Sequence, residues 1–176
     1  MIQDHPNIMR LYEFFDEETR YLVVAELCKG GELWEEMQNR ARWTEKEAAI
    51  ITKQVLTALN HCHSNNIVHR DVKPENIMLE DLKKLDQIKL IDFGVATRIK
   101  NLNEKLTEQV GSPYYIAPEV IKGSYNYKCD LWSTGVITYM LLSGMVPFQG
   151  TNSNEILTKV EAGNYEMKQG WQSVSE

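Results

Sequence analysis

Residues 69–76 (HRDVKPEN) bring together three side chains with complementary chemistry. The carboxylate of Asp71 can accept a proton from a hydroxyl group, and the ammonium of Lys73 can stabilise a phosphoryl group. The amide oxygen of Asn76 can bind a divalent cation. Because polar residues of these types are common in loops, this motif alone does not establish a catalytic site.

Two further motifs follow, at residues 92–94 (DFG) and 117–119 (APE). Asp92 comes directly after a short apolar run and precedes the flexible Gly94, so its carboxylate is well placed to bind a hard cation such as Mg²⁺. Each motif is weak by itself. Their order, their spacing and the helix, loop and strand patterns around them make a chance combination negligible.

A small amount of sheet should surround these motifs. Residues 8–15 and 21–25 are apolar runs on either side of an acidic turn at 16–18, and they predict two strands. Residues 77–79 and 88–91 predict two further short strands joined by a polar hairpin loop. The first motif would therefore precede one strand, and the second would follow the next.

Most of the remaining chain should be helical. Residues 44–65 predict an amphipathic helix, in which Thr44 and Glu47 form a capping box. Residues 131–142 are apolar almost all round, which is typical of a helix buried on every side. The apolar residues of the first helix share one face at a period of 3.6 residues: Ala48, Ile51, Val55, Ala58, Leu59 and Cys62.

Weak periodicity at residues 92–127 predicts a long loop, and long ordered loops in compact domains are usually functional. A shorter helix is expected at 154–162, and the end of the chain, 168–176, should again be a loop.

Composition places the chain among ordinary globular domains. Its 176 residues are enough for one domain, no apolar run is long enough to span a membrane, and the start does not resemble a signal peptide. The net charge of −6 disfavours a nucleic-acid partner. Three cysteines without a CxxC pair argue against disulfides and zinc, so a reducing, cytoplasmic location is expected.

With its motifs in this order, the chain resembles the eukaryotic serine/threonine protein kinases. Residues 73–76 (KPEN) are typical of the serine/threonine rather than the tyrosine enzymes. Residues 30–33, 114–119 and 128–133 are most similar to the calcium/calmodulin-regulated and calcium-dependent groups.

The resemblance implies an α+β, protein-kinase-like fold that is partial: a mainly helical C-lobe with the last strands of the N-lobe. Residues 1–26 would end the N-lobe, 27–31 would form the hinge, and 32–176 would belong to an incomplete C-lobe. The glycine-rich loop, the β3 lysine and the αC glutamate would lie upstream. We therefore expect these residues alone to be poorly stable and nearly inactive.

By the same resemblance, Asp71 is the catalytic base and Lys73 neutralises the transferred phosphate. Asn76 and Asp92 would hold two Mg²⁺ ions that bridge the phosphates of ATP. Ala25 stands at the gatekeeper position, where a small side chain opens a pocket behind adenine. The remaining residues implied to contact the nucleotide, or basic substrate side chains, are Glu26, Cys28, Glu32, Glu75 and Met78.

A further set of residues is implied to order the site. Arg70 would pair with the acidic Glu108 at the usual phosphorylation position, and Thr107 is the alternative phosphorylation site. Ser112 would bridge Asp71 and Lys73. Asp130 would accept hydrogen bonds from backbone amides of the catalytic loop, which is the segment with the motif at residues 69–76. It would lie beneath a hydrophobic spine of Leu11, His69 and Phe93.

The expected partners are protein substrates with basic residues near the target hydroxyl. No EF-hand loop occurs in these residues, so calcium sensing or calmodulin control would reside in a C-terminal extension. Two alternatives remain: a non-catalytic kinase-like binding or scaffold protein, and a phosphotransferase acting on small molecules. The intact acids and amide disfavour the first, and the long loop ending at 117–119 disfavours the second.

Overall fold

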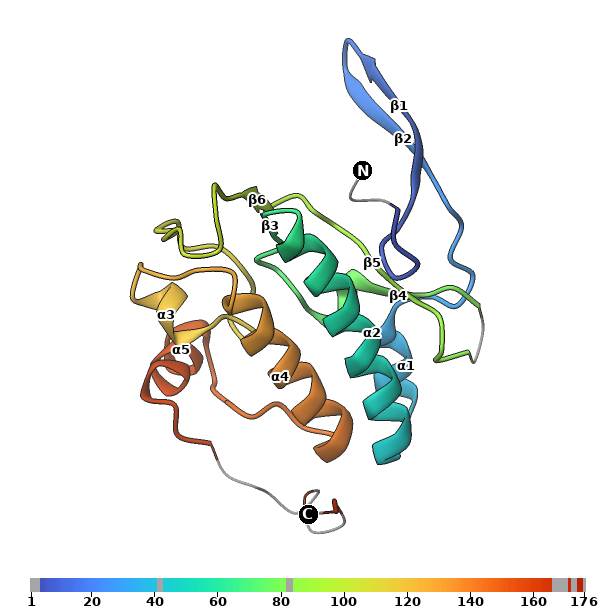
Figure 1. Cartoon of the computed structure of the whole chain (residues 1–176). Coiled ribbons are helices and arrows are strands. Elements are labelled where there is room, and N and C mark those ends of the chain that lie inside the picture. The colour runs from blue at the N-terminus through green and yellow to red at the C-terminus, as the bar shows by residue number, and fades with distance from the viewer. Residues whose placement is uncertain (1–3, 41–42, 82–83, 166–170, 172–173, 176) are drawn as a thin grey trace.

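A two-stranded hairpin projects from a mainly helical body (Figure 1). The computed structural model describes residues 4–40, 43–81, 84–165, 171 and 174–175. The hairpin consists of β1 (Leu11–Glu17) and β2 (Arg20–Ala25), which pair antiparallel. Both predicted strands are present.

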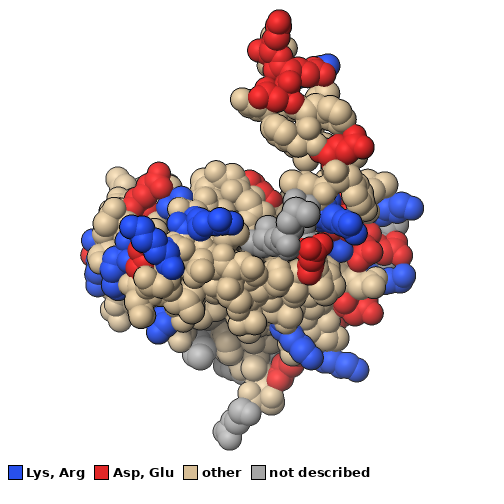
Figure 2. All heavy atoms as spheres, turned by 45° about the horizontal axis from the view of Figure 1, so that its top comes forward, with Lys and Arg blue, Asp and Glu red and all other residues tan. Residues whose placement is uncertain are grey.

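The first strand differs from the prediction at both ends, because it begins at Leu11 and extends into the acidic segment. Glu17 lies opposite Arg20, and the Arg20 Nε and Glu17 Oε2 atoms are 2.7 Å apart. This pair of opposite charges lets an acidic sequence continue as strand to the turn. Acidic side chains consequently gather at the tip of the hairpin (Figure 2).

The body is built on helix α2 (Glu45–Ser64), which has the predicted capping box. The Thr44 hydroxyl accepts from the Glu47 amide at 3.2 Å, and Glu47 Oε2 accepts from the Thr44 amide at 2.9 Å. The predicted apolar face is buried, from Ala48 to Cys62. It forms the main core with α4 (Cys129–Ser143).

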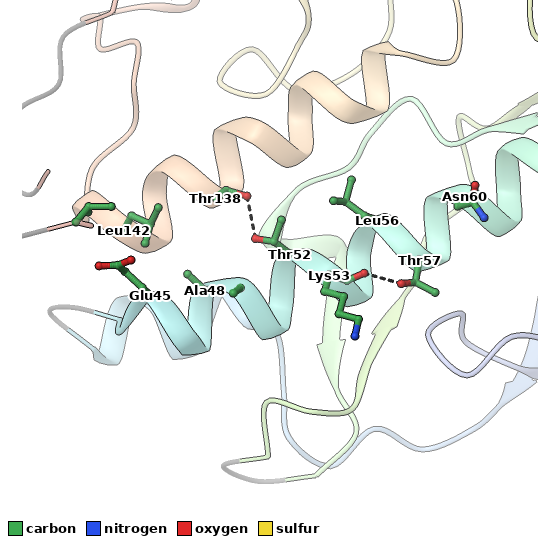
Figure 3. A pocket seen from close by; sticks show the side chains of 11 residues that line it. Glu45, Ala48, Thr52, Lys53, Leu56, Thr57, Asn60, Thr138 and Leu142 are labelled. Atoms are coloured by element: carbon green, nitrogen blue, oxygen red, sulfur yellow. Dashed lines mark hydrogen bonds between the residues drawn. The ribbon is translucent and has the colours of Figure 1, made fainter. Parts of the chain in front are cut away.

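Helix α4 packs beside α2, and the Oγ1 atoms of Thr52 and Thr138 share a hydrogen bond of 2.9 Å where the helices meet (Figure 3). The prediction that residues 131–142 are buried on every side is wrong at Leu131, which is 40% exposed. Leu131 and Leu56 line an open groove between the two helices. The sequence shows that this helix is apolar on all sides, but packing decides which of its side chains are buried.

Short elements connect the hairpin to the helices. The predicted pair of strands is present as β4 (Ile77–Leu79) and β5 (Ile88–Leu90), and helix α1 (Leu33–Asn39) packs beside β4. A second short sheet joins β3 (Ile67–Val68) to β6 (Thr97–Arg98).

The segment predicted as one long loop is therefore interrupted by β6 and also by helix α3 (Pro118–Ile121). Strand β6 forms because Val68 and Ile67 provide a pairing edge that is remote in the sequence. The predicted last helix is present as α5 (Ser153–Ala162), and most of the predicted loop at 168–176 lies outside the described residues.

The fold is thus α+β, with one hairpin followed by a mainly helical body, as the sequence predicts. Among the helices in the described ranges, none combines the length and the apolar character needed to cross a bilayer.

Thr44→Ala should weaken the start of α2 by about 1 kcal/mol, because it removes the hydroxyl that accepts from the Glu47 amide. Hydrogen exchange in the intact protein should show faster exchange at residues 45–47. Thr57→Ala is the matched control, since the exposed Thr57 hydroxyl donates only to the Lys53 carbonyl of its own helix. Equal exchange in both variants would contradict the capping role.

Candidate active site

A closed triangle of polar side chains forms the centre of the site. Lys73 Nζ lies 2.8 Å from Asp71 Oδ2 and donates to Ser112 Oγ at 3.0 Å. Ser112 Oγ in turn donates to Asp71 Oδ1 at 2.9 Å. The predicted bridge by Ser112 is present, and each oxygen of the Asp71 carboxylate has a partner that holds its orientation.

Asn76 lies directly beside this triangle. It ends the single-turn helix η1 (Pro74–Asn76), and its Nδ2 donates to the Asp71 carbonyl at 2.9 Å and to Asp71 Oδ2 at 3.3 Å. Both contacts use the nitrogen of the amide. Its Oδ1 therefore has no hydrogen-bond partner among the described residues and is left as a potential cation ligand.

Asp92 is held close to Asn76 through the backbone, because the amide of Ile91 donates to the Asn76 carbonyl at 3.0 Å. Asp92 itself is exposed, with a positive φ of 57°. Its Oδ1 accepts from the Gly94 amide at 3.0 Å, and a Cβ at Gly94 would lie 2.9 Å from this oxygen. A larger residue at position 94 would therefore push the Asp92 carboxylate out of this position.

The two neighbours of Asp92 are fixed by one buried histidine. His69 Nε2 donates to the Ile91 carbonyl at 3.0 Å, and its ring lies 4.8 Å from that of Phe93. The structure thus joins Asp71 and Asn76 by direct contact, and it joins Asp92 to them through the backbone. Within the described ranges, no group of three or more His, Cys, Asp or Glu side chains could hold a metal.

Beneath the site, the Asp130 carboxylate is 1% exposed and accepts hydrogen bonds from three nitrogen atoms. Two come from the amides of His69 and Arg70, at 3.0 and 2.8 Å, as the sequence predicts. The third comes from His63 Nε2 at 2.7 Å. His63 was missed because it follows the apolar face of α2, and nothing in the sequence distinguishes it from an exposed histidine.

The predicted hinge runs from the end of β2 toward α1. Ala25, which precedes it at the end of β2, is half-buried and pairs with Leu11. In the described part of the chain, the Glu26 carbonyl and the Cys28 backbone have no hydrogen-bond partner, so both can bind a ligand. Burial raises the pKa of the Cys28 thiol, and the nearby Glu26 carboxylate adds to this effect.

Lys89 is a hinge contact that sequence reasoning missed. Its Nζ lies 3.0 Å from Glu26 Oε2, and Glu26 Oε1 accepts from the Arg10 amide at 2.7 Å. Lys89 looks like an ordinary strand residue in the sequence, because its partner is far away along the chain. On the floor of the site, Glu32 and Met78 form an antiparallel bridge.

The predicted pair of Arg70 and Glu108 is also present. Arg70 Nη1 donates to Glu108 Oε2 at 2.9 Å, and Arg70 Nε donates to the Val95 carbonyl at 2.6 Å. The Arg70 side chain is 8% exposed, whereas that of Glu108 is 69% exposed. The neighbouring Thr107 is exposed.

Glu75 lies on the other side of the catalytic loop, and its Oε2 is buried without a hydrogen-bond partner. Burial raises the pKa of the nearby Tyr115 phenol, and the negative charge of Glu75 adds to this effect. Helix α1, which begins next to Glu32, packs against η1. Two half-buried carboxylates therefore lie on neighbouring elements at this side of the site.

Sequence comparison finds matches to known proteins along the whole chain. The family model described as protein kinase domain matches residues 1–176. The chain is 52% identical to calcium-dependent protein kinase 4 of Plasmodium falciparum over 163 residues, which are 92% of this chain and 31% of that protein. It is 47% identical to calcium-dependent protein kinase 5 of the same organism over 174 residues, or 98% of this chain and 30% of that protein.

A third relative, calcium-dependent protein kinase 3 of Plasmodium berghei, is 42% identical over 174 residues, or 98% of this chain and 31% of that protein. The chain thus spans just under a third of the length of the curated relatives that it matches. Because this family model matches all 176 residues, the chain belongs to the protein kinase family.

Proposed function

We propose that this chain forms part of an enzyme that transfers the γ-phosphoryl group of ATP to serine or threonine hydroxyls of protein substrates. The observation that carries the proposal is the triangle of Asp71, Lys73 and Ser112, with Asn76 in contact with Asp71. A carboxylate, an ammonium and an amide are the groups that phosphoryl transfer needs for positioning and charge stabilisation.

In this proposal Asp71 orients the substrate hydroxyl and accepts its proton. Its side chain is 14% exposed, so a substrate hydroxyl can reach it while its two oxygens remain held by Lys73 and Ser112. The ammonium of Lys73, which is 21% exposed, is close enough to stabilise negative charge that develops beside Asp71.

The donor set fits ATP with Mg²⁺. Oxygen ligands are the ones that Mg²⁺ prefers, and the free Oδ1 of Asn76 and the exposed carboxylate of Asp92 supply them. Two protein ligands leave the other positions to water and phosphate oxygens, as is usual for Mg²⁺ in nucleotide sites. When bound, Mg-ATP supplies the phosphoryl group and neutralises charge on it.

The adenine base would bind at the hinge, where the Glu26 carbonyl and the Cys28 backbone have no hydrogen-bond partner among the residues that the structure describes. Met78 would contact the base from below, and Glu32 would meet the ribose or a basic substrate residue. The Oε2 atom of Glu75, which is buried and has no hydrogen-bond partner among the described residues, supports a preference for substrates with basic residues, because a cationic side chain would satisfy it.

Glu108 is proposed to take the place of a phosphate group. Its pair with Arg70 would then order the activation segment, which is the long loop that follows the motif at residues 92–94, without phosphorylation. Calcium control of the whole protein is proposed from the names of its relatives, which are calcium-dependent protein kinases. Such control would use parts of the protein outside these residues. A cytoplasmic location agrees with the free cysteines.

Asp71→Asn should lower kcat by about 10²–10⁴-fold with little change in the affinity for ATP, because the amide cannot accept the substrate proton. The assay measures transfer of labelled phosphate to a basic peptide by the full-length protein. Asp86→Asn, the same change at an exposed position in the β4–β5 loop, should have no effect. A full-length protein that binds Mg-ATP but transfers no phosphate would favour the scaffold alternative.

Glu108→Lys should strongly reduce activity in the full-length enzyme, because it places two cations together at Arg70, whose side chain is nearly buried. Glu18→Lys makes the same change of charge in the exposed turn of the β1–β2 hairpin and serves as the control. Unchanged activity of Glu108→Lys would count against the proposed pair, and would leave Thr107 as the regulatory position.

Bulky purine-like inhibitors should compete with ATP in the full-length enzyme, because Ala25 leaves space behind the adenine position. Ala25→Met should weaken their inhibition by about tenfold or more, since its longer side chain fills that space. Competition assays at several ATP concentrations measure this effect. Absence of competition in the unmodified enzyme would refute the assignment of Ala25.

A further inference from the structure

Tyr125 is the largest fully buried side chain near the activation segment, with 1% of its surface exposed. Its phenol group donates to the Glu108 carbonyl at 2.6 Å and accepts from Arg70 Nη1 at 3.3 Å. One hydroxyl group therefore touches both members of the Arg70–Glu108 pair, and it touches Glu108 through the backbone rather than the carboxylate.

The backbone of Tyr125 makes a second attachment to the same segment. The Leu106 amide donates to the Tyr125 carbonyl at 2.8 Å, and the Tyr125 amide donates to the Leu106 carbonyl at 3.0 Å. Residues 106–108 are therefore fixed at both ends by one residue. In the same region, Gln109 Nε2 donates to the Ile121 carbonyl at 2.6 Å.

These contacts explain how the segment can be held in place although the Arg70–Glu108 ion pair is weak. The Glu108 carboxylate is 69% exposed, and an ion pair with one solvated partner contributes little because water screens it and ordering the side chain costs entropy. Holding the segment in place therefore needs a contact that is shielded from water. The buried phenol of Tyr125 provides one.

We propose that Tyr125 is a positioning residue, which fixes the backbone of residues 106–108 so that Glu108 stays paired with Arg70 without phosphorylation. This inference rests on the proposed regulation by that pair. It concerns Tyr125, which acts through Arg70 and Glu108 and does not itself touch substrate.

The protonation state of the phenol agrees with this role. Burial raises the pKa of Tyr125, so the hydroxyl stays protonated at neutral pH and can donate to the Glu108 carbonyl. The same oxygen keeps lone pairs that accept from Arg70. Phenylalanine would keep the ring packing and lose both hydrogen bonds.

The decisive experiment compares Tyr125→Phe with the unmodified full-length kinase. Hydrogen exchange of the amides at residues 106–110 should become about tenfold faster, because two hydrogen bonds are lost. The kcat/KM for a peptide substrate should fall by a similar factor, whereas the KM for ATP should change little, since the contacts lie at the activation segment and not at the hinge.

Tyr127→Phe is the matched control. Tyr127 is half-buried, its ring lies 4.9 Å from that of His63, and its hydroxyl has no hydrogen-bond partner within the described ranges. It should leave both exchange and kinetics unchanged. If Tyr125→Phe changed neither measurement, or lowered thermal stability without faster exchange at 106–110, the positioning role would be refuted.

A measurement on the unmodified protein tests the inference even if Tyr125→Phe does not fold. The Leu106 amide should exchange far more slowly than that of the exposed Leu102, whose amide has no hydrogen-bond partner within the described ranges, and exchange at equal rates would overturn the proposal. Hydrogen exchange also distinguishes failure of the proposed function from failure of the proposed role of Tyr125. A full-length protein without transferase activity would refute the proposed function, while protection of Leu106 would still support the role of Tyr125 in ordering the segment.

Discussion

The buried carboxylate of Asp130 is the interaction on which the catalytic loop depends. A carboxylate that is 1% exposed is stable only if its oxygens are satisfied, and here the amides of His69 and Arg70 and the ring of His63 do so. Its position in the first turn of α4 adds the favourable field of the helix N-terminus. Helix α4 thereby fixes two consecutive residues of the loop, and the position of Asp71 follows from theirs.

Fixing the loop in this way holds unusual backbone conformations in place. Arg70 and Asp92 both have positive φ values, of 70° and 57°, which side chains other than glycine adopt only when surrounding contacts compensate. At Arg70 the compensation comes from Asp130 and from the Val95 carbonyl. At Asp92 the compensation comes from the hydrogen bond of the Gly94 amide and from the contacts of His69 with Ile91 and Phe93. These two positions are residues proposed to pair with Glu108 and to bind Mg-ATP, whereas the third such residue, Asn66, lies in the turn after α2.

Arg70 connects this rigid centre to the activation segment. Its amide is held from below by Asp130, and its guanidinium reaches Glu108 and the Tyr125 phenol. A nearly buried guanidinium can make these contacts at once because its donors lie in a fixed fork. The state of the segment and the geometry of the catalytic loop are therefore linked through one side chain, which gives a physical route by which ordering the segment would affect transfer.

The sequence alone determined the elements with strong local signals and the identity of the motif residues. The capping box and apolar face of α2 and the β4–β5 pair could be predicted because capping and periodicity are local. The roles of Asp71, Lys73, Asn76 and Asp92 were predicted only through the resemblance of their motifs to those of protein kinases. Only the tertiary structure revealed β6, the exposure of Leu131, and the roles of His63, Lys89 and Tyr125. The partners of those three side chains lie far away in the sequence, and such pairings are decided by packing between elements, which no local pattern encodes.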